Sequence, residues 1–480
     1  MEKEDNKQRS DINKLKEKDN IISEDNSTFK ISGDSPMISV GILFSSKIRF
    51  SLNGKYKDAV TGEIYQGDYS ITKDIAKKDD NKGNELVSYR MEHGLKKRDI
   101  ELPIELVPTI PENCNFDLTE VTIGVNFHWE RKENQRFMGS IKIIDEGEHL
   151  TAINIISMED YLFSVISSEM NAESPMELLK SHAVISRSWL ISQKEKAEFV
   201  KDKNYKSTFE TEQETIKWYD REEHKNFDVC ADDHCQRYHG ITKVTTPQVK
   251  QALEETFGEV LVYDGKICDT RFSKCCGGVT ELFENTWEAD NAHEYLQSIS
   301  DSKKPLKPMD LTSEIGARRW ILSPPKVFCN TKDKKILASI LTNYDNETQD
   351  FFRWKVEFTT QTLSELVVRK TGIDFGTIKE IIPIERGKSG RIIRIKIVGT
   401  KSTHIIGKEL FIRKAFSESH LYSSAFIVEK QADGFIFYGA GWGHGVGLCQ
   451  IGAAVMASEG YNYKQILEHY FIGSSLEKLY

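Results

Sequence analysis

Short runs of β-branched and apolar residues, separated by turn residues, fill the chain from Ile38 to Ile144. The first run, Ile38–Phe44 (ISVGILF), has the length and composition of a strand, so this region predicts a β-rich unit. The pattern changes after Ser157, where apolar residues recur at intervals of three and four: Tyr161, Leu162, Val165, Ile166 and Met170. This spacing is that of one helix face, and serine commonly caps a helix start.

Turn and capping residues mark further elements. Ser174–Pro175 predicts the start of a second helix, because proline is favoured at the first helical position. Asp264–Gly265 lies between two strand-like runs and predicts a tight hairpin. Asn462, with Gln465 three residues later, predicts a capped last helix. Residues 194–225 are charged and aromatic without a clear period, and we interpret them as a surface excursion.

Together these elements predict an α+β fold, in which a core of mixed helices and antiparallel strands carries a β-rich N-terminal region and an α+β insertion. At 480 residues the chain is long enough for two or three domains. The predicted segments are a polar leader (1–36), the β-rich region (37–145), the first part of the core (146–302), the insertion (303–425), and the second part of the core with a glycine-rich run (426–480).

Composition excludes several classes of function. The formal net charge is −9, and lysine and arginine form no basic stripe, so nucleic acid is not an expected partner. Residues 1–36 are almost wholly polar and predict a disordered leader without a signal-peptide core. No apolar run reaches the roughly 20 residues that span a bilayer, so we expect no membrane span. These observations leave the location of the protein open.

A glycine occupies every second position of Gly439–Gly447 (GAGWGHGVG). In an extended segment, Trp442 and His444 would share one face, and the other face would be bare backbone. The spacing matches neither a P-loop nor a dinucleotide-binding motif, which argues against a nucleotide site. Two interpretations stay open: a face that a sugar or peptide approaches, with His444 and Gln450 beside it, or tight packing of strands.

Glu169 falls at the predicted C-terminal end of the first helix. The negative end of the helix dipole and the neighbouring apolar residues are expected to raise the pKa of this carboxyl group. A carboxyl group that stays protonated near neutral pH can act as a general acid. The alternative is an ordinary solvated glutamate at a helix end.

His224, Cys230 and Cys235 form a His-x5-Cys-x4-Cys pattern. Imidazole and thiolate ligands suit zinc, and three protein ligands leave a fourth position open. A Cys230–Cys235 disulfide, or simply buried thiols, is the equal alternative on spacing alone. The adjacent Cys275–Cys276 rarely bridge each other, so we expect them to pair with Cys268 or to line a pocket.

Six segments, in order along the chain, resemble the stage II sporulation protein D family, also called SpoIID/LytB or amidase-enhancer proteins. They are MEDYLFSVISSEMNAESPMELLKSHAVISRSWL, DVCADDHCQRYHG, RFSKCCGGVTELFENTW, RGKSGRIIRIKIVGT, ELFIRKAF and GWGHGVGLCQIGAAVMASEGYNYKQILEHYF. The resemblance covers about residues 150–480. Some members of that family are lytic transglycosylases that cleave peptidoglycan glycan strands, and others are known chiefly as enhancers of a cell-wall amidase.

The resemblance implies a catalytic role for Glu169, because the family's catalytic glutamate lies in a Ser-Glu-Met segment. It also implies a structural zinc ion on His224, Cys230 and Cys235, since one family member binds zinc through one histidine and two cysteines. Peptidoglycan strands and a cell-wall amidase are the implied partners. The residues expected to contact sugar are Gln236, Ser273, Trp442, His444 and Gln450.

Two positions depart from the family pattern. Asn171 replaces the usual proline after Ser-Glu-Met, and Cys275–Cys276 replaces a small or polar pair before Gly-Gly. Neither removes the acid, but the second alters the expected groove. An enzyme of the cell wall acts outside the cytoplasm, so the implied function conflicts with the expectation that residues 1–36 hold no signal-peptide core.

Overall fold

The structure is a computed structural model, and it describes residues 33–76, 86–124, 130–171, 174–200, 207–218, 224–232, 235–242, 247–287, 292–340 and 350–480. The fold is α+β, as the sequence predicts. Residues 1–32 of the expected disordered leader lie outside the described residues. No helix in the described ranges is both long and apolar enough to cross a membrane.

A sheet of eleven strands from the described residues forms the N-terminal region. Its central path runs β13-β1-β10-β9-β6-β2-β3-β4-β5, and β7 and β8 extend from β2. The strands are β1 (Met37–Ser45), β2 (Lys47–Asp58), β3 (Ile64–Ala76), β4 (Leu86–His93), β5 (Lys96–Ile100), β6 (Ile104–Pro108), β7 (Asn115–Ile123), β8 (Arg131–Phe137), β9 (Ser140–Asp145), β10 (Leu150–Ser157) and β13 (Val229–Cys230). A short 3-10 turn, η2 (Pro111–Asn113), precedes β7.

The sheet leads directly into the first helix, α2 (Met158–Glu169). β10 pairs antiparallel with both β1 and β9, so the predicted boundary at residue 145 falls within the β9–β10 hairpin and not between two units. Ser157 caps α2 as expected, because its side chain accepts from the Asp160 amide. The Pro36 carbonyl accepts from the Met158 amide at 2.8 Å, which ties the strand before β1 to the same helix start.

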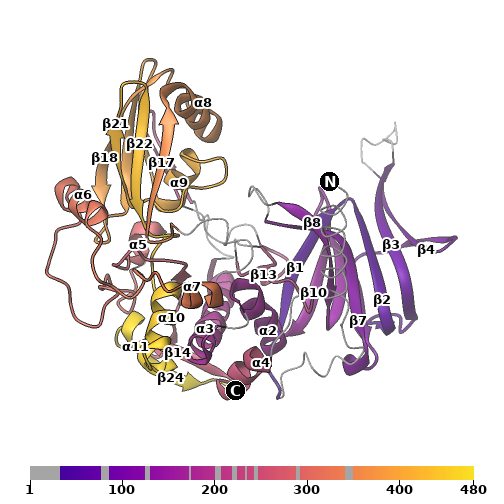
Figure 1. Cartoon of the computed structure of the whole chain (residues 1–480). Helices are drawn as coiled ribbons and strands as arrows, with labels where there is room; N and C mark the ends of the chain where they lie inside the picture. The colour runs from indigo at the N-terminus through magenta and orange to yellow at the C-terminus, as the bar shows by residue number, and fades with distance from the viewer. Residues whose placement is uncertain are drawn as a thin grey trace, which may run out of the picture.

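A helical layer packs against the side of this sheet that carries β1 and β10 and joins it to the rest of the chain (Figure 1). A buried ion pair at 2.7 Å between Glu159 and Arg187 holds the first two helices together. Asp264–Gly265 makes the predicted hairpin, and Asn462 and Gln465 form the predicted capping box. The elements of this layer are α3 (Met176–Val200), α4 (Pro247–Glu255), β14 (Glu259–Tyr263), β15 (Lys266–Ile267), α10 (Gln450–Ser458), α11 (Tyr463–Tyr470) and β24 (Ser475–Lys478).

A second α+β body stands apart from the N-terminal sheet, above the helical layer in Figure 1. One sheet has the order β17-β22-β21, and the other has the order β11-β12-β20-β19-β18. Its elements are β11 (Thr208–Glu210), β12 (Glu214–Lys217), α5 (Phe283–Thr286), α6 (Glu314–Leu322), β17 (Arg353–Thr359), α8 (Thr360–Thr371), β18 (Ile378–Arg386), β19 (Ile392–Gly399), β20 (Thr403–Gly407), α9 (Glu409–Ala415), β21 (Phe426–Lys430) and β22 (Gly434–Ala440). The helix α7 (Lys334–Ile340) packs against α10 in the helical layer.

The limits of this body differ from those of the predicted insertion, residues 303–425. β21 and β22 pair with each other and with β17, so the body continues to Ala440. β12 pairs in parallel with β20, which places part of the expected surface excursion inside the second sheet. Sequence periodicity misses both features because β17 and β12 lie far along the chain from their partners, β22 and β20.

Candidate active site

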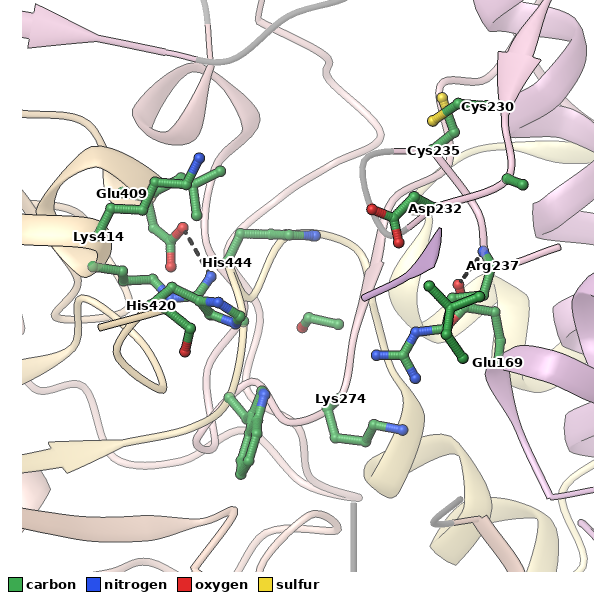
Figure 2. A pocket seen from close by; sticks show the side chains of 18 of the residues that line it. Glu169, Cys230, Asp232, Cys235, Arg237, Lys274, Glu409, Lys414, His420 and His444 are labelled. Atoms are coloured by element: carbon green, nitrogen blue, oxygen red, sulfur yellow. Dashed lines mark hydrogen bonds and ion pairs between the residues drawn. The ribbon is translucent and has the colours of Figure 1, made fainter. Parts of the chain in front are cut away.

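A cleft of about 1680 Å³ lies between the N-terminal sheet, the helical layer and the second body. Figure 2 shows its two sides facing each other across open space. We call one side the Glu169 wall, made of Glu169, Trp189, Asp232, Cys235 and Arg237. The opposite side is the His444 wall, made of Lys414, His420, Tyr422, Trp442 and His444. Ser273, Lys274 and Gln450 also line the cleft.

Glu169 is the last residue of α2, as the sequence predicts, and its half-buried side chain reaches the cleft. Val165 and Ile166, one turn earlier, are fully buried behind it. The backbone amide of Arg237 donates to one carboxylate oxygen of Glu169 at 2.9 Å. One oxygen is thus held from the neighbouring loop, which restricts the rotamers of the side chain.

His224, Cys230 and Cys235 come together beside this carboxylate. One possible ligand atom from each residue lies within 4.8 Å of the other two. Cys230 is positioned by β13, which pairs in parallel with β1 at the edge of the N-terminal sheet. All eight cysteines are free thiols in the structure, so the pair is not a disulfide. Two sulfurs and one imidazole at this spacing fit a zinc ion with one open position.

The glycine run has a different conformation from the expected extended one. Gly441, Gly443, Gly445 and Gly447 all have φ between 72° and 90°, a region that residues with a Cβ rarely adopt. A Cβ on Gly445 would lie 2.3 Å from the guanidinium carbon of Arg391, and one on Gly447 would lie 2.1 Å from the Arg271 carbonyl oxygen. The protein itself covers the glycine positions, so the tight-packing interpretation is the correct one.

Trp442 and His444 nevertheless line the cleft. The Val446 amide donates to Nδ1 of His444 at 3.0 Å, and the ring packs edge-on against Trp287 at 4.9 Å between centroids. Burial, together with the charges of Arg271 and Arg391, lowers the pKa of His444 well below its ordinary value. This histidine is therefore neutral near pH 7 and is held in place by its neighbours.

Gln450 and Ser273 both reach the cleft. The amide nitrogen of Gln450 lies 3.2 Å from Nε2 of His182, whose Nδ1 lies 3.1 Å from the Ser186 hydroxyl. Burial, with a smaller effect of Lys274, lowers the pKa of His182 to about 3. The Ser273 hydroxyl has no hydrogen-bond partner among the described residues, which suits a contact to a ligand.

The structure corrects the expectation for Gln236. This residue is 1% exposed and does not belong to the cleft lining. Its side-chain oxygen accepts from the Tyr161 hydroxyl at 3.4 Å, behind the Glu169 wall. Gln236 therefore supports the wall from inside and is not placed to contact a sugar.

The sequence analysis did not identify most of the aromatic and basic residues that line the cleft. The guanidinium of Arg271 lies 4.4 Å from the centre of the Trp287 ring and pairs with Asp269 at 2.6 Å. Motifs around these positions were visible, but no local pattern shows which side chains face a cleft. The lining includes the aromatic residues Trp189, Trp218, Trp287, Tyr422 and Trp442, and the basic residues Arg237, Arg271, Lys274, Arg413 and Lys414.

Comparison with known proteins separates the two walls. Residues 146–263, which contain the Glu169 wall, match the family described as stage II sporulation protein. Residues 281–447, which contain the His444 wall, match a domain of unknown function, DUF8618. Stage II sporulation protein D of Bacillus amyloliquefaciens is 22% identical over 335 residues, which are 68% of this chain and 76% of that protein. Residues 146–263 are thus similar to the stage II sporulation protein family, and the chain as a whole is similar to stage II sporulation protein D.

Two further relatives extend this comparison. An uncharacterized protein of Brachyspira hyodysenteriae is 27% identical over 337 residues, 70% of this chain and 71% of that protein. The amidase enhancer of Bacillus subtilis is 25% identical over 239 residues, 47% of this chain, and the match spans only 32% of the enhancer. The SpoIID family resemblance of the sequence is thus confirmed.

Proposed function

We propose that the protein is a peptidoglycan lytic transglycosylase in which Glu169 acts first as general acid and then as general base. The observation that carries this proposal is the position of Glu169. Its carboxylate lines the large cleft, is held by the Arg237 amide, and lies in the segment that matches the SpoIID family.

The proposed reaction needs one carboxyl group. Glu169 donates its proton to the glycosidic oxygen between N-acetylmuramic acid and N-acetylglucosamine, and the bond from this oxygen to C1 of the muramic acid breaks. The C6 hydroxyl of the same sugar then attacks C1, and the Glu169 carboxylate takes up the hydroxyl proton. The product is a 1,6-anhydro end, and no water is consumed, in contrast to the two-carboxylate hydrolases.

The cleft lining suits a glycan that bears peptides. Trp189, Trp287 and Trp442 offer flat apolar surfaces against which sugar rings pack. Arg237, Lys274 and Lys414 place positive charge in a chain whose net charge is −9. Stem peptides and the lactyl group of muramic acid carry carboxylates, and these cations, which alternate with the lining acids Glu146, Asp232, Glu409 and Glu418, offer partners for them.

A zinc ion on His224, Cys230 and Cys235 fits this proposal as a structural element. The ion would bind two sulfurs and one nitrogen and tie the loop to β13. Arg237, whose amide holds Glu169, follows Cys235 by two residues. These three ligands would therefore fix the position of the catalytic carboxylate, and the glycosidic chemistry itself requires no metal-bound hydroxide.

The second candidate function is a glycan-binding enhancer of a cell-wall amidase without catalysis of its own. It is favoured by the similarity to the Bacillus subtilis amidase enhancer, which extends over 47% of this chain. In that case the cleft binds glycan and Glu169 contributes no turnover.

The experiment is to incubate the full chain with isolated peptidoglycan and with glycan strands stripped of stem peptides, and to analyse soluble products by mass spectrometry. Glu169→Gln is the test variant, and Glu254→Gln, an exposed position on α4, is the matched control. We expect products about 18 Da lighter than the hydrolysed sugars, the mass of one water, from the wild type and the control only.

Products with the mass of the hydrolysed sugars would mean that the protein is a hydrolase and not a transglycosylase. Asp232 of the Glu169 wall would then be the first candidate for the second carboxylate. Absence of product from both substrates, while wild type and Glu169→Gln still sediment with the glycan, would leave the enhancer function.

A further inference from the structure

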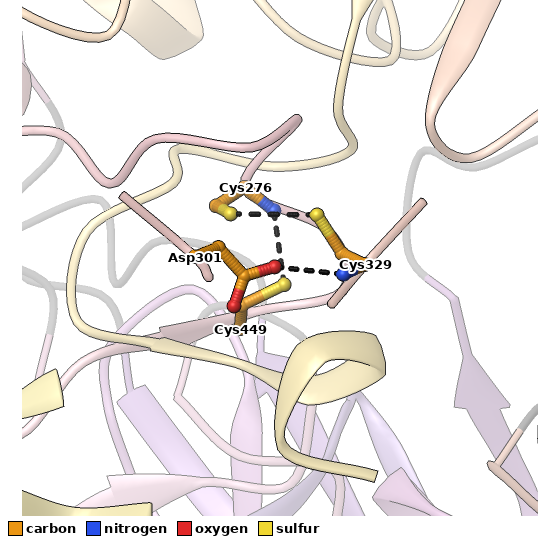
Figure 3. A group of neighbouring side chains, drawn as sticks. All are labelled: Cys276, Asp301, Cys329 and Cys449. Atoms are coloured by element: carbon orange, nitrogen blue, oxygen red, sulfur yellow. Dashed lines mark hydrogen bonds between the residues drawn. The ribbon is translucent and has the colours of Figure 1, made fainter. Parts of the chain in front are cut away.

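A second cluster of metal-binding side chains lies apart from the cleft lining. One possible ligand atom from each of Cys276, Asp301, Cys329 and Cys449 lies within 4.8 Å of the other three. All four residues are at most 2% exposed. Figure 3 shows the three sulfurs and the carboxylate turned toward one common point.

The spacing of the sulfurs fits a single tetrahedral ion. Two thiolates that each lie about 2.3 Å from a tetrahedral zinc ion are about 3.8 Å apart. The sulfurs of Cys276 and Cys329 are 3.7 Å apart, far longer than a disulfide bond of about 2.05 Å. Cysteines around an iron–sulfur cluster bind different iron atoms and lie farther apart, so the spacing favours a mononuclear ion.

Backbone amides already support the ligand atoms. The Cys276 amide donates to the Cys449 sulfur at 3.2 Å, and the Gly278 amide donates to the Cys276 sulfur at 3.3 Å. Asp301 is held at both oxygens, by the Cys329 amide at 2.8 Å and by the Tyr470 hydroxyl at 2.6 Å. Such contacts orient ligands and stabilise thiolates at metal centres.

Three thiolates and one carboxylate would bring four negative charges into a dry interior, which is costly without a cation. Arg353 interacts electrostatically with Cys276 and Cys329, but its guanidinium group also donates to four backbone carbonyls around it. One guanidinium group would not balance four such charges, so the four groups can be ionised together only around a divalent ion at the centre of the cluster.

We propose that Cys276, Asp301, Cys329 and Cys449 form a second, structural zinc site, closed by four protein ligands. Zinc is the class of ion that three thiolates and one oxygen at tetrahedral spacing favour. This site does not rest on the proposed enzymatic activity, and it is separate from the three ligands beside Glu169.

A metal ion in this cluster would fix the part of the cleft lining that contains Ser273 and Gln450. Cys276 follows β16 (Phe272–Ser273), and Cys449 ends β23 (Leu448–Cys449), which pairs in parallel with β16. Of the cleft residues, Gln450 directly follows Cys449, and Ser273 lies three residues before Cys276. An ion that crosslinks the cluster therefore holds both cleft residues in register.

The test is the metal content of the purified full chain, measured by elemental mass spectrometry after expression with added zinc. We expect two zinc equivalents in the wild type, and one in each of two double variants, Cys276→Ser/Cys329→Ser and His224→Ala/Cys230→Ser. Cys268→Ser, a buried cysteine outside both clusters, is the matched control and keeps two equivalents. The first double variant is also expected to melt at a lower temperature.

If the Cys276→Ser/Cys329→Ser variant does not fold, a spectroscopic measurement on another variant still tests the proposal. The His224→Ala/Cys230→Ser chain retains the buried cluster, and cobalt(II) bound there is expected to show tetrahedral bands and intense sulfur-to-metal charge transfer. A wild type with one zinc equivalent that disappears in His224→Ala/Cys230→Ser would overturn the proposal. A Cys276–Cys329 disulfide in peptide mapping of the native protein would overturn it as well.

Discussion

The two walls of the cleft are built in different ways. The Glu169 wall consists of the end of α2, Trp189 of α3 and the loop that follows β13, and the hydrogen bond from Arg237 to Glu169 joins the loop to the helix end. The His444 wall combines the end of α9, the loop that follows it and the glycine run beyond β22. On the first wall the Glu169 carboxylate is held by a backbone amide, and the second wall offers aromatic and cationic surface. We therefore expect the Glu169 wall to carry the chemical step and the His444 wall to contribute mainly to glycan binding.

The largest effect is expected at Glu169. Glu169→Gln keeps the size and the hydrogen-bond acceptor but removes the proton donor, so the cleavage rate at saturating glycan should fall by about 10²–10⁴-fold. Binding of the glycan should change little, because the His444 wall is untouched. The rate at which soluble products form measures cleavage, and sedimentation with glycan measures binding. An equal loss of cleavage and binding would mean that Glu169 also contributes to glycan binding.

A smaller effect is expected from the loop that supports Glu169. His224→Ala should remove one zinc equivalent and lower the cleavage rate by at most about 10²-fold, because Arg237 and the carboxylate that it holds are displaced slightly. Metal analysis and the same kinetic assay measure the change. Lys225→Ala, an exposed position beside His224, is the control and should behave as wild type.

The contact between α3 and Gln450 predicts a pH dependence of stability. The pKa of His182 is about 3 in the folded protein and about 6.5 when unfolded, so the unfolded chain binds the proton first. Stability from this group is complete above pH 6.5 and falls by about 1.4 kcal/mol per pH unit below it, down to the folded pKa. Denaturant unfolding at pH 7, 6 and 5 measures this slope.

His182→Gln should flatten that slope, and His93→Gln, an exposed position on β4, should leave it as in the wild type. An unchanged slope in His182→Gln would show that other groups dominate the acid sensitivity.

The smallest effect is expected for a single cation of the His444 wall. Lys414→Ala should weaken glycan binding by about 0.5–1 kcal/mol, a few-fold in affinity, and the difference should shrink at high salt. Sedimentation with glycan at two ionic strengths measures it, with Lys430→Ala, an exposed position at the end of β21, as control. A salt-independent loss would indicate that Lys414 acts through packing.

Local patterns made part of this protein predictable. The helix that ends in Glu169, the Asp264–Gly265 hairpin and the Asn462 cap each depend on residues within about one turn of each other, and each is where the sequence predicts it. His224, Cys230 and Cys235 lie within 4.8 Å because they belong to one short loop, so their spacing in sequence already carried the signal. Their role with zinc, like the role of Glu169, stays a prediction.

Contacts between distant segments were not predictable in the same way. Cys276 and Cys449 are 173 positions apart, yet the amide of one donates to the sulfur of the other. The glycine run is evident in the sequence. Only the structure shows that Arg391 and residues 271–277 pack directly against it, which is why its glycines are needed. The sequence by itself determined the resemblance to the SpoIID family, the helix that carries Glu169, and the nearness of His224, Cys230 and Cys235 to one another. Only the tertiary structure decided the opposite wall, the four buried ligands and the cleft, because each depends on long-range packing that no local periodicity encodes.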